Sequence, residues 1–289
     1  MVQSVRPTGC PMPRRSHAFG LLLAALSLGL TGCSMNLATH EELVEKTFAA
    51  KPKPTVIVET FNGAIDVKVD GQALLLAKVR KRGSGATEDA AKADCANIEV
   101  TFEEEAGNTF RITAKRIGNS SWSGNSGAAV EILVPENAAL ELKTANGAVN
   151  ANGAFRSLTT KSSNGAISAK GGSGIIDVQT SNGSVEVEAT TADLLKMQSS
   201  NGRLRFVGSL GEGEHSMKTS NGSVNVQLPS ETSFRLDAST SNGRVGCEFD
   251  LRKKEKERKS QLIGTVGTKP LATLTIKTSN GTVEIEKRD

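Results

Sequence analysis

The chain has 289 residues, with 35 Lys and Arg against 31 Asp and Glu, a formal net charge of +4. Three Arg and no acidic residue fall within residues 1–32, so the rest of the chain carries 32 basic and 31 acidic residues, about +1. This balance argues against nucleic-acid binding, and a composition of nine Phe, one Trp and no Tyr argues against sites that stack sugars or bases on aromatic rings.

The first 32 residues have the pattern of an export signal. Arg6, Arg14 and Arg15 precede an apolar run over residues 18–30, and small residues follow it. A basic start, a short apolar core and a small-residue cleavage site are typical of a cleavable signal peptide. The apolar run is too short to cross a bilayer core of about 30 Å as a helix.

The end of this segment, Leu30-Thr31-Gly32-Cys33, resembles the lipobox of bacterial lipoproteins. The resemblance implies removal of residues 1–32 and acylation of Cys33, palmitate being among the usual chains. Two or three acyl chains give a stable membrane anchor. Ser34 resembles the residue that follows the cysteine in outer-membrane lipoproteins. We therefore expect a lipid-anchored protein of the cell envelope, in the outer membrane of a Gram-negative bacterium.

Residues 33–53 are predicted to form a lipidated tether. Thr39-His40-Glu41-Glu42 has the spacing of a capping box and predicts a short helix to about Ala50. Lys51-Pro52-Lys53-Pro54 follows and predicts a stiff spacer. Residues 54–289 form the remaining predicted domain.

A repeated motif organises residues 54–289. Thr or Ser, a variable residue, Asn, Gly, another variable residue and an aliphatic residue occur in this order eight times. From the second motif the asparagines are 18, 18, 19, 20 and 21 residues apart, and the last step is 38, or two units of 19. A regular period of this kind indicates a repeat fold. The asparagines are Asn62, Asn146, Asn164, Asn182, Asn201, Asn221, Asn242 and Asn280.

Apolar and polar residues alternate on both sides of each motif, as in β-strands. Around Asn221, for example, Met217 and Thr219 share one face with Val224 and Val226. Asn-Gly also favours tight hairpin turns, so an antiparallel meander is the alternative architecture. Because the motif marks only one end of each unit, we predict an all-β parallel solenoid, in which asparagines of stacked coils form a hydrogen-bonded ladder.

Two segments interrupt the pattern. Residues 71–135 predict strands at 73–80, 98–103, 109–115 and 130–134, a helical insertion at 86–96, and a loop containing Trp122. Residues 252–259, with the sequence RKKEKERK, occupy most of one missing corner and are predicted to form a solvated loop.

We identify no catalytic residue, no metal-ligand spacing and no cofactor motif. His40 and His215 are isolated, and His215 is expected in an exposed loop. Cys95 and Cys247 are expected to be buried free thiols, although an oxidising envelope also permits a disulfide.

One outward-facing row of side chains precedes the asparagines by three positions. It forms either a solubilising surface or a surface for an anionic polymer. Outward Arg203, Arg205 and Arg244 extend its basic character, and Glu186, Glu188 and Glu284 reduce it. The row contains Lys143, Lys161, Gln179, Gln198, Lys218, Ser239 and Lys277.

The Thr-Ser-Asn-Gly-x-Val repeats, clearest at 180–185, 219–224, 240–245 and 278–283, resemble a bacterial putative-adhesin family of unknown function. The resemblance covers about residues 54–289 and implies a β-solenoid, secretion or membrane attachment, and no catalytic residues. It favours a non-catalytic structural or adhesive module that contacts a surface polymer or an envelope protein. The alternatives are a glycan-active enzyme on a β-helix and a scaffold or sensor for another envelope protein.

Overall fold

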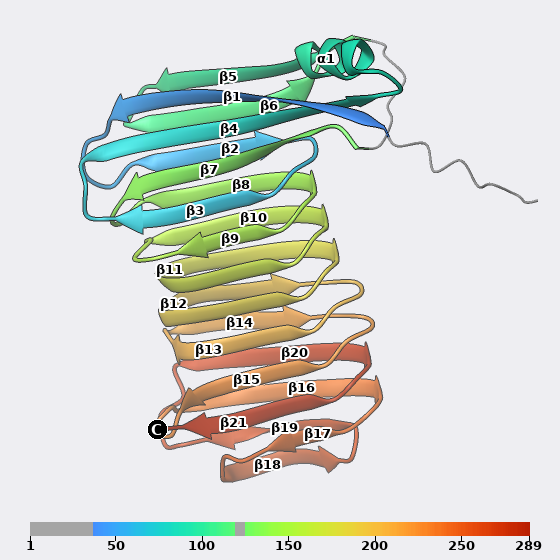
Figure 1. Ribbon diagram of the computed structural model, residues 1–289. Coiled ribbons are helices and arrows are strands. Elements are labelled where there is room, and N and C mark those ends of the chain that lie inside the picture. The colour runs from blue at the N-terminus through green and yellow to red at the C-terminus, as the bar shows by residue number, and fades with distance from the viewer. Residues whose placement is uncertain (1–36, 119–124) are drawn as a thin grey trace, which may run out of the picture. The chain divides into compact units, whose positions relative to one another are not determined.

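The computed structural model describes residues 37–118 and 125–289, which contain one helix and 21 strands (Figure 1). No helix in these residues combines the length and apolar character needed to cross a membrane. The N-terminal elements are β1 (Ala38–Ala49), β2 (Thr55–Thr60), β3 (Ile65–Asp70), β4 (Leu74–Gly85), α1 (Glu88–Ala96), β5 (Ile98–Glu105), β6 (Thr109–Arg116) and β7 (Gly127–Pro135). The central elements are β8 (Ala139–Asn146), β9 (Val149–Asn152), β10 (Ser157–Asn164), β11 (Ile167–Asn182), β12 (Val185–Gln198), β13 (Leu204–Leu210), β14 (Gly213–Lys218) and β15 (Val224–Pro229). The C-terminal elements are β16 (Phe234–Asn242), β17 (Val245–Cys247), β18 (Leu251–Arg258), β19 (Gln261–Val266), β20 (Ala272–Asn280) and β21 (Val283–Arg288).

The repeats form a parallel β-solenoid, which confirms the predicted fold class. β10 pairs in parallel with both β8 and β11, and Asn164 lies opposite Asn146 on one side and Asn182 on the other. A meander would pair these strands antiparallel. Each coil contributes one strand before its Asn-Gly corner, on what we call the first face, and one after it, on the second face.

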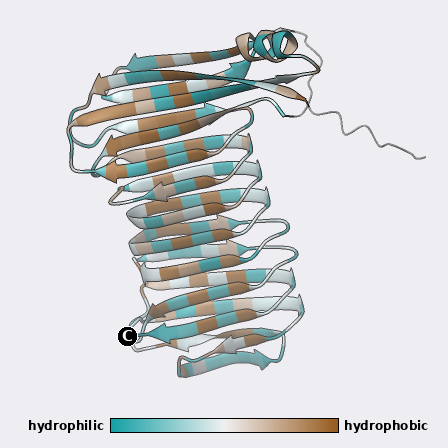
Figure 2. Cartoon of the chain, in the orientation of Figure 1, coloured by the Kyte–Doolittle hydropathy of each residue, from teal (hydrophilic) through white to brown (hydrophobic). Residues whose placement is uncertain are grey.

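The core lies between the two faces and consists of the predicted inward residues. Around Asn221, Met217, Val224 and Val226 are almost fully buried, and Thr219 is buried beside the corner. Figure 2 shows the resulting alternation of apolar and polar bands along the strands. Burying one Val, Leu, Ile or Met side chain is worth about 1.5–3 kcal/mol. A coil can bury these side chains only against the coils beside it, so each coil depends on its neighbours for stability.

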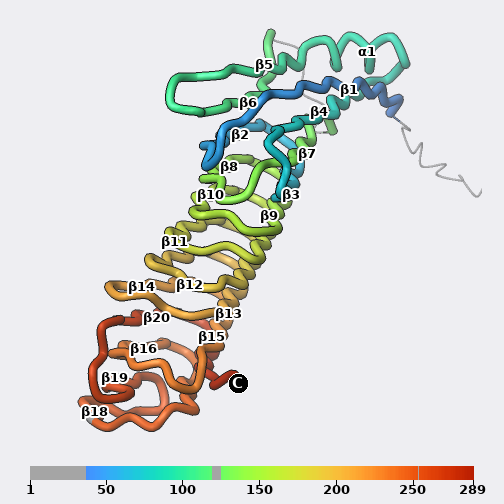
Figure 3. The backbone as a smooth tube through the Cα atoms, turned by 90° about the vertical axis from the view of Figure 1, so that its left-hand side faces the viewer, coloured from blue at the N-terminus to red at the C-terminus, as the bar shows by residue number. Residues whose placement is uncertain are grey.

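The coils do not stack in chain order. The first coil, β2–β3, lies between β6–β7 and β8–β9. The last coil, β20–β21, lies between β14–β15 and β16–β17. The last step of 38 residues therefore holds no missing corner, because the chain returns through a hairpin and inserts its final coil one position back (Figures 1 and 3).

Antiparallel strands close both ends of the stack. At one end β1 pairs with β4, β4 with β7, and β5 with β6. At the other end β19 pairs with β16 and β18 with β19. Residues 252–258 thus belong to strand β18 and Lys259 to the turn after it. The prediction of a solvated loop was wrong, because pairing with β19 satisfies the backbone despite the high charge of the segment.

The predicted helix over residues 39–50 was also wrong. The segment is strand β1, which pairs with β4 over twelve residues and places the Phe48 ring 5.2 Å from that of Phe110. A capping box is a local signal, and here long-range pairing outweighs it. Lys51 to Pro54 form a turn rather than a spacer, since the Asn108 side chain accepts from the Lys51 N–H and donates to its carbonyl.

The helical insertion and its flanking strands are confirmed. α1 begins after Thr87, whose hydroxyl accepts a hydrogen bond from the Ala90 N–H. Gly83 and Gly85 of β4 lie directly under the helix, and a Cβ on either would collide with α1 backbone atoms. Trp122 and the predicted lipidation site Cys33 lie outside the described residues.

Candidate functional site

The asparagine side chains of neighbouring coils form a continuous ladder. From Asn164 onward, each carboxamide donates a 2.8 Å hydrogen bond to the Oδ1 of the asparagine that precedes it in the stack. In stack order the ladder runs Asn146, Asn164, Asn182, Asn201, Asn221, Asn280 and Asn242. Asn280 comes before Asn242 in this order because the final coil is inserted between the coils of Asn221 and Asn242.

The other two residue types that recur in the motif, Thr or Ser and Gly, also have defined contacts at the corner. The Thr or Ser hydroxyl donates to the glycine carbonyl of the neighbouring coil, as from Thr219 to Gly202 at 3.0 Å. A Cβ on Gly202 would overlap the carbonyl oxygen of Gly183, so only glycine permits the close stacking. These contacts assign the motif to the architecture of the corner.

Asn62 departs from this arrangement. It lies at the corner of the first coil, and its side chain donates to the Ser126 carbonyl at 2.6 Å instead of to another asparagine. The corner beside it, at Ser126 to Ala128, has no Asn-Gly pair. This explains why the sequence motif does not mark the coil formed by β6 and β7.

The row three positions before the asparagines points outward on the first face. We call it the lysine row. Its lysines and glutamines are exposed or half-buried, and they lie in register on adjacent strands. In stack order it runs Lys143, Lys161, Gln179, Gln198, Lys218, Lys277 and Ser239.

The insertion of the final coil changes the composition of this row. It places Lys277 directly opposite Lys218, whereas chain order would have placed Ser239 there. Lys143 and Lys161 form a second pair of this kind. Adjacent strands are about 4.8 Å apart, and like charges directly opposite one another destabilise a sheet.

Few acidic groups neutralise the row. Lys143 has a long contact of 3.9 Å with Glu59. Lys161, Lys218 and Lys277 form no ion pair with any residue that the structure describes. The row therefore contains two pairs of lysines, separated by Gln179 and Gln198, whose ammonium groups have little internal counter-charge.

A shallow groove of about 340 Å³ lies at the Lys143 end of the row. Lys115, Lys143 and Lys161 line it together with Glu59 and Phe61. Lys115 comes from β6, outside the repeats, and sequence reasoning missed it because no motif places β6 beside the first coil.

The second face carries mixed charges that pair with one another. Arg205 bonds Glu186 at 2.9 Å and lies 3.5 Å from Glu188, which also binds Lys170 at 3.2 Å. Among the predicted outward groups, Arg205, Glu186 and Glu188 are thus brought together as ion pairs, whereas Arg203 has no ion pair with any residue that the structure describes. Arg244 lies 3.5 Å from Glu284.

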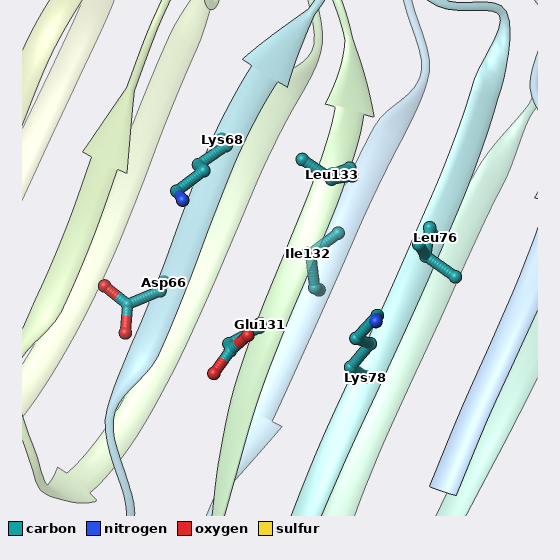
Figure 4. Close-up of a pocket in the computed structure, with 7 residues that line it drawn as sticks. All are labelled: Asp66, Lys68, Leu76, Lys78, Glu131, Ile132 and Leu133. Carbon is teal, nitrogen blue, oxygen red and sulfur yellow. The ribbon is translucent and has the colours of Figure 1, made fainter.

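A second groove of about 410 Å³ lies where β7 joins β3 and β4 (Figure 4). Leu76 and Leu133 form part of its floor, with Asp66, Lys68, Lys78 and Glu131 around them. Most of these charges have internal partners: Asp66 accepts from Asn150 at 2.7 Å, and Lys78 binds Glu45 at 3.1 Å. The groove is therefore less suited to an external ion than the lysine row.

His215 is a core residue, so its predicted place in an exposed loop was wrong. It is 1% exposed, its Nδ1 accepts from the Leu195 N–H at 3.2 Å, and its Nε2 lies 2.9 Å from the Gly211 carbonyl. The glycine-rich segment around it is strand β14, which turns the ring inward. Burial lowers the pKa of His215 and outweighs the opposing effects of the Gly211 hydrogen bond and Asp193.

The two remaining cysteines are free thiols, as expected. Cys95 is buried in α1 and Cys247 is half-buried in β17. Burial raises the pKa of both thiols, which disfavours the reactive thiolate. Within residues 37–118 and 125–289, no cluster of three or more His, Cys, Asp or Glu has the geometry to hold a metal ion.

A buried polar cluster joins α1 to the sheet. Asp94 accepts hydrogen bonds from the Ser84 N–H, the Ser126 hydroxyl and the Arg116 guanidinium. Burial alone would raise the pKa of Asp94, but these hydrogen bonds hold it below its usual range. The cluster fixes the position of the helix.

Residues 154–286 match the family described as Toastrack DUF4097. The match covers the coils from β10 to β21, which is less than half of the chain. The resemblance inferred from the Thr-Ser-Asn-Gly repeats is thereby confirmed. No curated protein matches the chain.

Several solved structures are similar at low identity. A putative cell adhesion protein from Clostridium sporogenes is 12% identical, with 86% of this chain and 100% of that chain covered and a TM-score of 0.37. A putative adhesin from Bacteroides fragilis is 13% identical, with 84% and 97% covered and a TM-score of 0.39. A putative lipid binding protein from Parabacteroides distasonis is 10% identical, with 84% and 96% covered and a TM-score of 0.28. At these TM-scores the fold assignment depends on the strand pairing described above.

Proposed function

We propose that the protein is a lipid-anchored, non-catalytic binding module of the cell envelope, and that the lysine row is its contact surface for an anionic polymer. The proposal depends on one observation: two pairs of lysines lie in register on adjacent strands, Lys143 with Lys161 and Lys218 with Lys277. Their mutual repulsion lowers the stability of the free protein. A polymer with closely spaced acidic groups would relieve it.

The rigid spacing of the row supports this role. The side chains project from one sheet whose strands are held in register by the asparagine ladder. Binding to a fixed row costs little conformational entropy in the protein backbone. A line of charges spread over several coils suits an extended polymer better than a small ligand.

The proposed anchor would hold this surface close to a membrane. Four residues lie between Cys33 and Ala38, the first residue of β1, so the two are five residue steps apart. A fully extended chain of five residues spans at most about 18 Å. The tether is therefore shorter than the predicted segment 33–53, of which residues 38–49 belong to strand β1.

Membrane fractionation of cells that produce the full chain tests the anchor. We expect the wild-type protein in the outer-membrane fraction, with a mature N-terminus whose mass includes acyl chains on Cys33. Cys33→Ser should abolish the acylation and the release of residues 1–32. A wild-type mature chain without lipid on Cys33 would contradict the anchor.

Cell assays test the adhesive role separately. Deletion of the gene should weaken attachment to surfaces or the integrity of the envelope, and the wild-type gene should restore it. A gene encoding Lys161→Gln, Lys218→Gln and Lys277→Gln should fail to restore it although its product reaches the membrane. Full restoration by this variant would contradict the role of the row.

A further inference from the structure

The two terminal strands of the first face carry opposite charge. At one end β5 contains Glu99, Glu103, Glu104 and Glu105 and no Lys or Arg. At the other end β18, with the sequence LRKKEKER, contains five basic and two acidic residues. Each strand pairs along one side only, β5 with β6 and β18 with β19.

Internal ion pairs leave part of each charge free. Glu99 binds Lys115 and Glu105 binds Arg111, so Glu103 and Glu104 remain without an ion pair among the described residues. In β18, Lys254 binds Glu257 and Glu255 binds Arg235. Among the side chains of β18 that the structure describes, the exposed basic groups without an ion pair are those of Arg252, Lys256 and Arg258.

An open strand edge presents unpaired N–H and C=O groups, and charged side chains prevent unwanted pairing there. In this protein the charges oppose contact between two β5 edges, which are both acidic. They also oppose contact between two β18 edges, which are both basic. They favour contact between β5 of one copy and β18 of another.

The strand directions fit the same contact. β18 is antiparallel to β19, which is antiparallel to β16, so β18 runs in the direction of the repeat strands. β5 is antiparallel to β6, which is parallel to β2, so β5 runs the opposite way. Two copies stacked in the same orientation would bring β18 and β5 together antiparallel, and both strands have eight residues.

We infer that copies of this chain associate head to tail, with the β18 edge of one copy pairing with the β5 edge of the next. Such a contact is heterologous, because it uses different surfaces on the two copies, and it continues into a filament unless it closes into a ring. The inference is independent of the proposed lipid anchor and of the lysine row.

Sedimentation velocity of the full chain in detergent provides the first test. At low ionic strength we expect the average mass to rise with protein concentration to that of a dimer and beyond. High salt should reverse the rise, since exposed charges are screened within about 3 Å at 1 M salt. A chain that remains monomeric over the whole concentration range at low salt would overturn the inference.

Charge reversal tests which edges meet. The variant Glu103→Lys with Glu104→Lys should remain monomeric, because both of its edges are then basic. The variant Lys256→Glu with Arg258→Glu should also remain monomeric, because it makes the β18 edge acidic like β5. A mixture of the two variants should assemble, since each then offers the edge that complements the other.

A variant that reverses two exposed charges away from the edges, Glu136→Lys with Glu141→Lys, is the matched control and should assemble like the wild type. Circular dichroism establishes that each variant is folded before it is mixed. Failure of the folded variants to assemble when mixed, or assembly of either one alone, would overturn the pairing of β5 with β18.

Discussion

At the scale of single residues, the repeated motif is explained by contacts between coils. The asparagine closes the ladder, the hydroxyl of Thr or Ser binds a neighbouring glycine carbonyl, and the glycine leaves room for that carbonyl. None of these contacts requires a ligand. The motif therefore identifies the fold, and the proposed contact surface is formed by outward residues that lie between motifs.

Asn201→Ala should destabilise the protein by about 1–2 kcal/mol, because it removes two ladder hydrogen bonds that are partly replaced by water. Gly202→Ala should destabilise the protein more than Asn201→Ala, since the added Cβ would overlap the Gly183 carbonyl. Urea unfolding measures both changes. Ser200→Ala at the same corner is the control and should be nearly neutral; an Asn201→Ala variant as stable as the control would contradict the ladder's contribution.

His215 should make the protein sensitive to acid. Its folded-state pKa is lowered, so the unfolded chain binds the proton more readily, and stability is lost as the pH falls below about 6.5. One such group contributes a slope of at most about 1.4 kcal/mol per pH unit. Unfolding measured from pH 7.5 to 5 should show a smaller slope for His215→Leu than for the wild type or the control His40→Gln. Equal slopes would contradict the assignment.

At the scale of elements, the two ends of the stack differ from its repeats. Antiparallel strands replace parallel ones, and α1 packs on β4 through a buried polar cluster. Asp94 is its centre and the partner of Arg116, whose side chain is only 14% exposed. The helix position therefore depends on a charge that is satisfied internally.

Asp94→Ala should destabilise the α1 end by about 3 kcal/mol, because it removes the carboxylate that forms an ion pair with the buried Arg116 guanidinium. Hydrogen exchange should show the loss of protection concentrated in α1 and β4. Asp89→Ala, on the first turn of the same helix, is the control and should have a small effect. Equal protection in Asp94→Ala and the wild type would argue against the cluster's role.

The sequence predicted the repeats well and the ends poorly, for a physical reason. Alternation and Asn-Gly spacing define each coil locally, and this was enough for the core around Asn182 or Asn221. The coils from β8 to β21 present the same ladder, however, so the motif does not specify which of them stacks on which. The position of β20–β21, the strand β1 and the strand β18 each depend on long-range pairing that no local pattern encodes.

The candidate site was predicted in the same partial way. The lysine row followed from the period, but the pairing of Lys218 with Lys277 within it, and the place of Lys115 in the groove beside Lys143, required the stack order. His215 was misplaced because the glycines and glutamates around it suggested a loop.

At the scale of the described domain, the last coil is an interior element. A repeat protein that loses a terminal repeat loses one interface. Here removal of β20–β21 would break the pairing with β14–β15 and also that with β16–β17. The C-terminal residues are thus needed for the continuity of the stack.

Ending the chain at Pro270 should prevent folding. It removes four large buried side chains, Leu274, Ile276, Val283 and Ile285, worth roughly 6–12 kcal/mol together, which equals the stability of a typical domain. Soluble yield and circular dichroism measure the result. A chain ending at Lys287 is the control and should fold; cooperative folding of the chain ending at Pro270 would contradict the inserted order.

The lysine row depends on features at all three scales. Its lysines lie on paired strands, and the inserted coil brings Lys277 beside Lys218. Binding of the full chain to polygalacturonate, a polymer with one carboxylate per sugar, tests it most directly. The variant Lys161→Gln, Lys218→Gln and Lys277→Gln should bind between about threefold and about a hundredfold more weakly, since each exposed contact contributes about 0.2–1 kcal/mol. It should also unfold at a slightly higher urea concentration, because the repulsion between paired lysines is relieved. The charge-matched control Lys51→Gln, Lys92→Gln and Lys269→Gln should bind like the wild type. Equal binding by the wild type and the row variant would contradict the account.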